Sequence, residues 1–340
     1  MSDRQEEDWS RREFVGGLAL VGTAGLLGLQ AEHVAAEPPP ETTRVRLARV
    51  RSICRAPQYM TEELLRAEGF TDVQYIQWPT TLEASIAAAA AKVDITMQYI
   101  GPSIIQVDTG QPLVVLAGVQ PGCFELFATD RVRSIRDLKG KTVSVVDIGG
   151  GDYIFLASMM TYVGLDPRKD VTWTKNPFAE GMQQLAEKKV DALLALPPEP
   201  QELRARRIGH VVVNSVVDRP WSQYFCCMVV GHRDFVRKNP IATKRVLRAI
   251  LKAADVCAAN PPRAAQFLVD KGYAENYDYA LQALKEIPYN KWREYDHEDT
   301  MRFYALRLHE ASLIKSSPQK IIAQGTDWRF LNEIKKELKG

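Results

Sequence analysis

Residues 141–163 read KTVSVVDIGGGDYIFLASMMTYV and contain the unit from which the fold is built. Residues 142–146 are rich in valine and other β-branched side chains, which predicts a strand. The apolar stretch 151–163 is long enough for a helix, and Gly164 is the type of residue that ends one. A strand, a turn of three glycines and a helix in this order predict one βα unit of a parallel sheet.

The same unit recurs on both sides of this stretch. Short strand-like segments alternate with helical segments of about 10–15 residues from residue 44 to about 130, and again from about 131 to 215. We therefore predict an α/β protein with two lobes, each a mostly parallel sheet flanked by helices. Lobe 1 would comprise residues 44–130 together with 221–335, whose second part is mostly helical, and lobe 2 would comprise residues 131–220.

The first 43 residues differ from the rest. Arg11 and Arg12 precede an apolar run over residues 16–29, and small residues ending at Ala36 follow, which is the layout of an export signal. Paired arginines are typical of the twin-arginine type. The alternative is a membrane anchor, but 14 glycine-diluted residues are short for a hydrocarbon core of about 30 Å. We expect cleavage after Ala36, a periplasmic location, and an extended linker over residues 37–43.

Composition narrows the possible functions. Residues 1–36 hold three Arg and six Asp or Glu, so the remaining chain keeps 41 basic and 36 acidic residues. This excess of positive charge is small and evenly spread, and it does not indicate a nucleic-acid partner. A hydrophobic content of 46% is sufficient for a packed core. We expect the mature chain to be a soluble globular protein.

No pattern of cysteine, histidine or carboxylate residues indicates catalysis, a metal or a cofactor. The five cysteines are Cys54, Cys123, Cys226, Cys227 and Cys257, and none of them shows zinc-type spacing. In an oxidising compartment these cysteines could form one or two disulfides, and their odd number would leave at least one free thiol. Cys226 and Cys227 are adjacent in a predicted strand, so we expect their side chains on opposite faces.

Ligands of parallel α/β sheets bind beyond the carboxyl ends of the strands. Two such lobes facing each other would form a cleft lined by the loops at those ends. These loops are predicted at residues 52–57, 78–80, 99–103, 120–124, 148–153 and 196–199.

Several side chains in these loops have the chemistry of ligand contacts. The glycines beside Asp152 allow backbone N–H groups at the start of a helix to bind an anion. Asp152 itself either binds an amine of the ligand or only caps the helix. Aromatic residues at strand ends suit a planar ligand. Arg55 is either a partner for an acidic ligand or an exposed loop residue, and Glu199 is either an acceptor or a solvated acid. The predicted ligand contacts are Arg55, Trp78, Tyr99, Gly101, Phe124, Gly149, Gly150, Gly151, Asp152, Tyr153, Glu199 and Cys226.

Several stretches of the chain together resemble a known family. The stretches 89–100, 138–143, 149–166, 189–192, 199–200 and 228–250 are similar, in order and spacing, to the nitrate/sulfonate/taurine-type substrate-binding proteins of ABC importers, which include binders of thiamine-precursor pyrimidines. This resemblance implies a type II periplasmic binding fold, a monomer, a small-molecule ligand and a membrane permease as partner.

The resemblance also bears on the ligand. Gly150 and Gly151 stand where the sulfonate binders of the family have small hydroxyl residues, and Asp152 is a further departure. A planar, aromatic or nitrogen-containing organic ligand is therefore favoured over a sulfonate.

Two alternatives remain at this stage. One is a ligand sensor that signals to a membrane receptor. The other is an enzyme similar to the pyrimidine synthases of thiamine biosynthesis, whose hallmark is a cysteine cluster. Cys226 and Cys227 resemble a shortened version of that cluster, but an export signal does not suit an intracellular synthase, and we expect no enzymatic activity.

The paired arginines provide a test of the export route. Replacing both Arg11 and Arg12 with Lys should leave the precursor in the cytoplasm, because the twin-arginine pathway reads that pair. Cell fractionation followed by immunoblotting measures the distribution. Normal export of the double variant would contradict the assignment of the signal.

Overall fold

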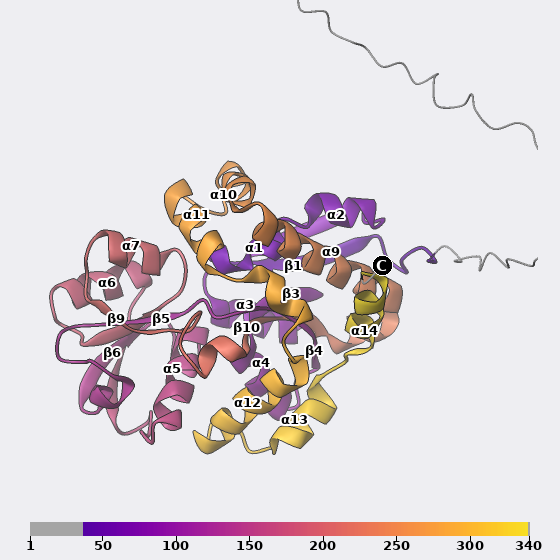
Figure 1. Cartoon of the computed structure of the whole chain (residues 1–340). Coiled ribbons are helices and arrows are strands. Elements are labelled where there is room, and N and C mark those ends of the chain that lie inside the picture. Colours follow the sequence, from indigo (N-terminus) through magenta and orange to yellow (C-terminus); the bar gives the residue numbers. More distant parts are fainter. Residues whose placement is uncertain (1–36, 339–340) are drawn as a thin grey trace, which may run out of the picture. The chain divides into compact units, whose positions relative to one another are not determined.

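The predicted alternation of strands and helices is confirmed in a computed structural model, which describes residues 37–338 (Figure 1). Within this part of the chain, ten strands pair into two five-stranded sheets. The first sheet has the order β2 (Asp72–Gln77), β1 (Arg44–Arg49), β3 (Ile95–Tyr99), β10 (Phe225–His232) and β4 (Leu113–Pro121). The second has the order β7 (Val171–Lys175), β6 (Lys141–Val145), β8 (Ala192–Ala195), β5 (Glu125–Ala128) and β9 (His210–Asn214).

Each sheet is mostly parallel, with one antiparallel strand in the fourth position. In the first sheet β10 runs antiparallel to both β3 and β4, and in the second β5 runs antiparallel to β8 and β9. These two strands are the first that the chain enters after it crosses from one sheet to the other. The sheets are therefore joined by two crossing segments, one between β4 and β5 and one between β9 and β10.

The membership of β5 differs from the sequence-based boundary. Residues 44–130 were expected to lie together in lobe 1, but Glu125 and Ala128 pair with β8 and β9 of the second sheet. The chain crosses at residues 122–124, directly after β4. Pairing partners about 70–90 residues away decide this, and no local pattern around β5 contains that information.

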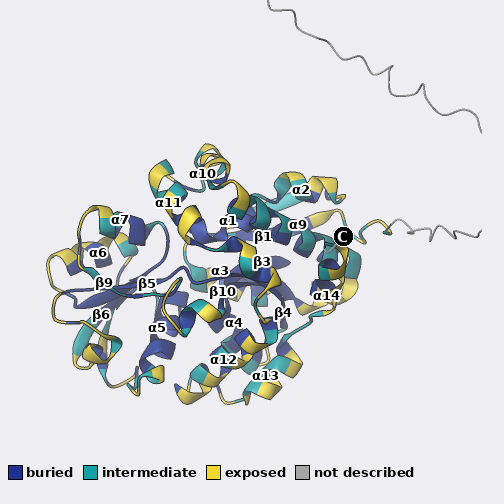
Figure 2. Cartoon of the chain, viewed as in Figure 1, coloured by how far each residue is buried: buried dark blue, intermediate teal, exposed yellow. Residues whose placement is uncertain are grey.

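Helices cover both sheets, and the central strands are mostly buried, whereas the edge strands β2, β7 and β9 are only partly buried (Figure 2). Two short helices follow β1, and a 3-10 helix precedes β10. Thr80 caps the helix that follows β2, accepting a hydrogen bond from the Glu83 N–H at 3.2 Å. The α-helices are α1 (Ala56–Tyr59), α2 (Glu62–Ala67), α3 (Thr81–Ala89), α4 (Ile100–Asp108), α5 (Gly151–Tyr162), α6 (Phe178–Ala186), α7 (Glu199–Ala205), α8 (Arg233–Lys238), α9 (Pro240–Ala259), α10 (Pro261–Asp270), α11 (Tyr277–Glu286), α12 (His297–Glu310), α13 (Pro318–Gly325) and α14 (Arg329–Glu337). The 3-10 helices are η1 (Ile53–Arg55), η2 (Ile135–Leu138), η3 (Trp221–Gln223) and η4 (Tyr289–Arg293).

The expected linker is attached to the first sheet's helices. The Glu41 carboxylate accepts hydrogen bonds from the N–H groups of Ile241 and Ala242, both at 3.0 Å, at the start of α9. Arg245 of α9 also donates to the Pro38 carbonyl at 2.8 Å. An acidic group at a helix N-terminus is stabilised by the unpaired N–H groups there. Residues 38–41 therefore form part of the folded unit.

The expected export signal, residues 1–36, lies outside the described residues. Among the residues that the structure describes, no helix combines the length and the apolar character needed to cross a membrane.

Each sheet has a point where the order of its strands reverses, so that the connections from the two strands there lead to opposite sides of the sheet. In the first sheet this point lies between β1 and β3, and in the second between β6 and β8. At such a point the two outgoing loops diverge, which opens a crevice at the carboxyl ends of the strands. Between β1 and β3 the backbone pairing is short, since only Leu47 and Ile95 are register partners.

The Gln58 side chain bridges β1 and β3 beyond that pair. Its Nε2 donates to the Ala48 carbonyl, and its Oε1 accepts from the Met97 N–H, both at 2.5 Å. Gln58 is fully buried, so its amide satisfies two backbone groups that water cannot reach.

Replacing Gln58 with Leu should therefore destabilise the protein by about 2–5 kcal/mol, because two buried backbone groups each lose a partner worth about 1–3 kcal/mol. Denaturant unfolding followed by circular dichroism measures the change. The exposed Gln77→Leu in β2 is the control and should change the free energy of unfolding by less than about 0.5 kcal/mol. Equal effects of the two substitutions would argue against the bridging role.

Candidate ligand-binding site between the two sheets

A cavity of about 540 Å³ lies at the crevices of both sheets. Its walls combine residues that follow β1 and β2 of the first sheet with residues that follow β6, β7 and β8 of the second. Its size is in the range of pockets for small organic ligands. The lining residues are Val50, Arg51, Pro79, Thr80, Thr81, Glu83, Val146, Asp147, Asp152, Lys175, Pro177, Phe178, Ala179, Leu196 and Glu199.

Asp152 is the first of two buried carboxylic acids in this wall. It lies in the first helical turn of α5, directly after the three glycines, and is 3% exposed. One carboxylate oxygen accepts a hydrogen bond from the Val146 N–H at 2.6 Å. Burial nevertheless raises the pKa of Asp152 to about 6, because the charged form loses its hydration.

Glu199 is the second buried acid and begins α7, after β8. It is 4% exposed, and its Oε2 has no hydrogen-bond partner among residues 37–338. Burial raises the pKa of Glu199 to about 7. An unpartnered buried acceptor is costly, and a ligand N–H group in the cavity would satisfy it.

The positive side chains in the same wall already have acidic neighbours. Lys175 contacts Asp147 at 2.8 Å, and Arg51 contacts Glu275 at 3.4 Å. The cavity therefore combines two buried acids with cations that are engaged in ion pairs. Such a surface suits a ligand that donates hydrogen bonds more than it suits an anion.

A smaller cavity, of about 20 Å³, adjoins the larger one and shares Thr81 and Leu196 with it. Two aromatic rings, those of Tyr99 and Phe124, lie in its wall and meet edge to face with centroids 5.6 Å apart. Arg55 also lines it; this residue is 2% exposed, and its Nη1 has no hydrogen-bond partner within the described part of the chain. The alternative that Arg55 is an exposed loop residue is therefore wrong.

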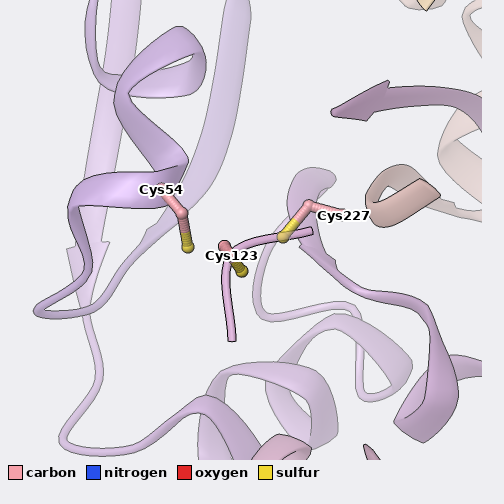
Figure 3. Close-up of side chains that lie close together, drawn as sticks. All are labelled: Cys54, Cys123 and Cys227. Carbon is pink, nitrogen blue, oxygen red and sulfur yellow. The ribbon is translucent and has the colours of Figure 1, made fainter. Parts of the chain in front are cut away.

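Three cysteine thiols surround this smaller cavity. Cys54 lies in η1, Cys123 on the first crossing segment and Cys227 in β10, and their side chains converge in Figure 3. Their Sγ atoms all lie within 4.8 Å of one another, and all three residues are buried. Hydrogen bonds from the neighbouring thiols hold the pKa of Cys227 well below its usual range.

Cys226 does not line either cavity, but it is close to this group. Its Sγ lies 3.2 Å from the Sγ of Cys123. Cys226 is not a member of the group of three thiols that lie within 4.8 Å of one another, and the pairing of β10 with β4 shifts register on both sides of Cys227. That Cys226 and Cys227 point to opposite faces of the sheet stays a prediction. All five cysteines have free thiols in this structure.

The predicted contacts divide into those at the cavities and those elsewhere. Asp152 and Glu199 line the larger cavity, and Arg55, Tyr99, Phe124 and Gly151 line the smaller one. The remaining six predicted contacts line neither cavity: Trp78, Gly101, Gly149, Gly150, Tyr153 and Cys226.

Packing explains several of these differences. Tyr153 is buried against Trp173, with ring centroids 4.8 Å apart. The Trp78 ring lies 5.7 Å from the Lys92 Nζ. A Cβ at Gly101 would approach Tyr99 at 2.6 Å, so this glycine permits close helix packing. Gly150 donates its N–H to the Asp147 carbonyl at 2.9 Å, which uses the group expected to face an anion.

Sequence reasoning missed the thiol group and the lining residues Arg51, Thr81 and Lys175. Cys54 and Cys123 fall in loops that were predicted to line the cleft, so their positions carried a signal. Spacing rules detect cysteines that are near one another in the sequence, and these are not.

The two α/β sheets with crevices at a shared cavity define a two-lobe architecture of the periplasmic binding protein type. The chain belongs to the NMT1/THI5-like family, whose model matches residues 66–264. The nitrate/nitrite binding protein NrtA of Nostoc sp. is 21% identical over 297 residues, which cover 79% of this chain and 67% of that protein.

Solved structures show the same fold. The periplasmic nitrate-binding protein NrtA from Synechocystis PCC 6803 superposes with a TM-score of 0.72 at 16% identity, over 89% of this chain and 90% of that one. The alkanesulfonate-binding protein SsuA from Xanthomonas axonopodis pv. citri, bound to MOPS, gives a TM-score of 0.67 at 15% identity, over 86% and 100%. The predicted periplasmic binding protein fold and the family resemblance are confirmed.

The buried acids make stability depend on pH. Glu199 has its pKa raised from 4.5 to about 7, so the folded state keeps a proton that the unfolded state loses as pH rises above about 4.5. This contribution to stability is present at low pH and is lost between about pH 4.5 and pH 7. One pKa unit corresponds to about 1.4 kcal/mol, so the loss is on the order of 3 kcal/mol.

Replacing Glu199 with Gln should remove this loss, and the melting temperature of the variant should fall less than that of the wild type over the same pH range. Thermal unfolding at a series of pH values measures the difference. The exposed Glu63→Gln should reproduce the wild-type profile. Parallel pH profiles for Glu199→Gln and the wild type would show that folding does not raise the pKa of Glu199.

Proposed function

We propose that this chain is the solute-binding component of an ABC importer, which captures a small organic solute between its two lobes and delivers it to a membrane permease. The observation that carries the proposal is the position of the 540 Å³ cavity at the crevices of both sheets. Membership of the NMT1/THI5-like family and the fold shared with nitrate- and alkanesulfonate-binding proteins support it.

Capture follows from the way the two sheets share the cavity. Glu199 and Asp152 come from the second sheet, whereas Arg51 and Thr81 come from the first. A solute that contacts both walls binds only when the lobes are closed, so it shifts the equilibrium towards the closed state by its differential affinity. The permease would recognise that state. This mechanism is binding without turnover.

The ligand is proposed to be planar or nitrogen-containing. Two buried acids with raised pKa values face the larger cavity, and they match a solute that carries N–H donors or a positive charge. Tyr99 and Phe124, in the adjoining cavity, offer aromatic surface. Nitrate and sulfonates, which the similar proteins are named for, would face two acids instead.

Location and assembly complete the proposal. The arginine pair and apolar run of residues 1–36 support export to the periplasm by the twin-arginine route. The nearly balanced charge of the remaining chain does not suit a nucleic-acid partner. The protein is proposed to act as a monomer.

A thermal-shift screen of the protein tests this function. The library contains pyrimidines and other N-heterocycles, amines, aromatic acids, carboxylates, sulfonates, nitrate and bicarbonate. A ligand at about 100 times its dissociation constant adds about 2.7 kcal/mol of stability, which is a shift of several degrees. We expect nitrogen-containing solutes to give this shift, with no consumption of the compound.

Two glutamate variants test whether the solute binds in the larger cavity. Glu199→Gln should weaken the response to amines and N-heterocycles, whereas the exposed Glu63→Gln should leave it unchanged. A shift from sulfonates or nitrate alone would contradict the ligand class. Consumption of a library compound would contradict a purely binding function.

A further inference from the structure

The thiols of Cys54, Cys123 and Cys227 come from three distant parts of the chain and meet at one point. Cys54 follows β1, Cys123 lies between β4 and β5, and Cys227 lies in β10. Their exposed fractions are 4%, 3% and 2%. Figure 3 shows the three side chains directed towards a common region, with Cys123 between the other two. Core cysteines without a shared role do not need to converge in this way.

The spacing of the three sulfur atoms matches the needs of a metal ion. A metal bound to thiolates at about 2.3 Å in a trigonal plane would hold its three sulfur atoms about 4.0 Å apart. The three Sγ atoms lie within 4.8 Å of one another. Small rotations of the side chains would therefore bring all three sulfur atoms to bonding distance of one ion.

The surroundings favour a soft ion of low charge. Among residues 37–338, no His, Asp or Glu joins the three thiols within that distance, and Cys226, whose Sγ lies 3.2 Å from that of Cys123, is not within it of all three. Thiolate ligands select soft ions such as Cu(I), whereas structural zinc sites have four ligands. Tyr99 and Phe124 line the same cavity and add apolar surface to it.

Arg55 is an independent observation at the same place. It lines the cavity with the three thiols, is 2% exposed, and has no hydrogen-bond partner for its Nη1 within the described residues. A buried guanidinium nitrogen without a hydrogen-bond partner is costly. Three thiolates around one Cu(I) ion carry a net charge of minus two, which would offset the charge of Arg55.

We propose that Cys54, Cys123 and Cys227, which converge beside the buried Arg55 at the junction of the two sheets, form a three-sulfur site for a soft metal cation, with Cu(I) as its reference ion. Each thiol releases its proton to solvent as its sulfur–metal bond forms, and the oxidation state of the metal does not change. The proposal deepens the proposed function, on which it rests for the role of the cavity, by adding a metal or a metal-bearing solute to its ligands.

Competition for Cu(I) tests the site. The full chain is reduced, freed of reductant under inert gas, and shown by thiol titration after denaturation to have all five cysteines free. It is then titrated with Cu(I) held by bicinchoninate, a coloured chelator. We expect one Cu(I) ion per chain to move to the protein, and X-ray absorption at the copper edge to show sulfur neighbours at about 2.3 Å.

Serine variants assign the ligands. Cys54→Ser, Cys123→Ser and Cys227→Ser should each lower Cu(I) affinity by at least about tenfold. Cys257 is the matched control, because it is fully buried and its Sγ lies 3.5 Å from the Met60 sulfur, outside the thiol group. Cys257→Ser should keep wild-type affinity. Circular dichroism and the unfolding midpoint of each variant separate loss of the site from loss of the fold.

Two results would overturn the proposal. One is that the reduced wild type leaves Cu(I) with the chelator. The other is that Cys257→Ser lowers affinity as much as the three site variants. The thermal-shift screen without metal distinguishes this from failure of the proposed function: a solute shift without Cu(I) binding rejects the metal site alone, and Cu(I) binding without any solute shift supports the site and rejects the organic solute.

Discussion

The structure depends on a hydrogen-bonded contact between the two segments that cross from one sheet to the other. The Ser215 hydroxyl donates to the Phe124 carbonyl at 2.8 Å and accepts from the N–H groups of Cys123 and Phe124 at 3.1 and 2.9 Å. Gly122, with φ of +61°, allows this approach, since a Cβ there would meet the Val216 Cα at 2.5 Å. Both crossings are thereby fixed side by side, and the two crevices open towards the same cavity.

This contact also explains why so much polar chemistry is buried at one place. Cys123 and Phe124 are held by Ser215 and at the same time line the smaller cavity. The helices that follow β6 and β8 bring Asp152 and Glu199 to the larger cavity. Burying acids and a guanidinium opposes folding, and one oxygen of Glu199 and one nitrogen of Arg55 have no hydrogen-bond partner among residues 37–338, so the remaining core must compensate for them. Such groups are typical of binding sites, where a ligand supplies the missing partner.

The comparison with related proteins separates the framework of the fold from the residues at the cavities. The fold is shared with NrtA and SsuA at 15–16% identity, because alternating strands and helices with buried apolar faces determine the framework. The proposed ligand contacts are few, and they lie at or near strand ends, where the sequence can change without loss of the framework. Fold and ligand class are therefore separate questions for this chain.

The sequence alone determined the α/β class and the strand-end loops, and it named Asp152 and Glu199 as candidate contacts, because these follow from patterns within a few dozen residues. Only the tertiary structure decided that β5 joins the second sheet, that Arg55 is buried and that Tyr153 packs away from the cavities. It also brought together cysteines far apart in the chain, including Cys123 and Cys226 across 103 positions. Strand pairing and burial depend on partners distant in sequence, so local periodicity carries no record of them.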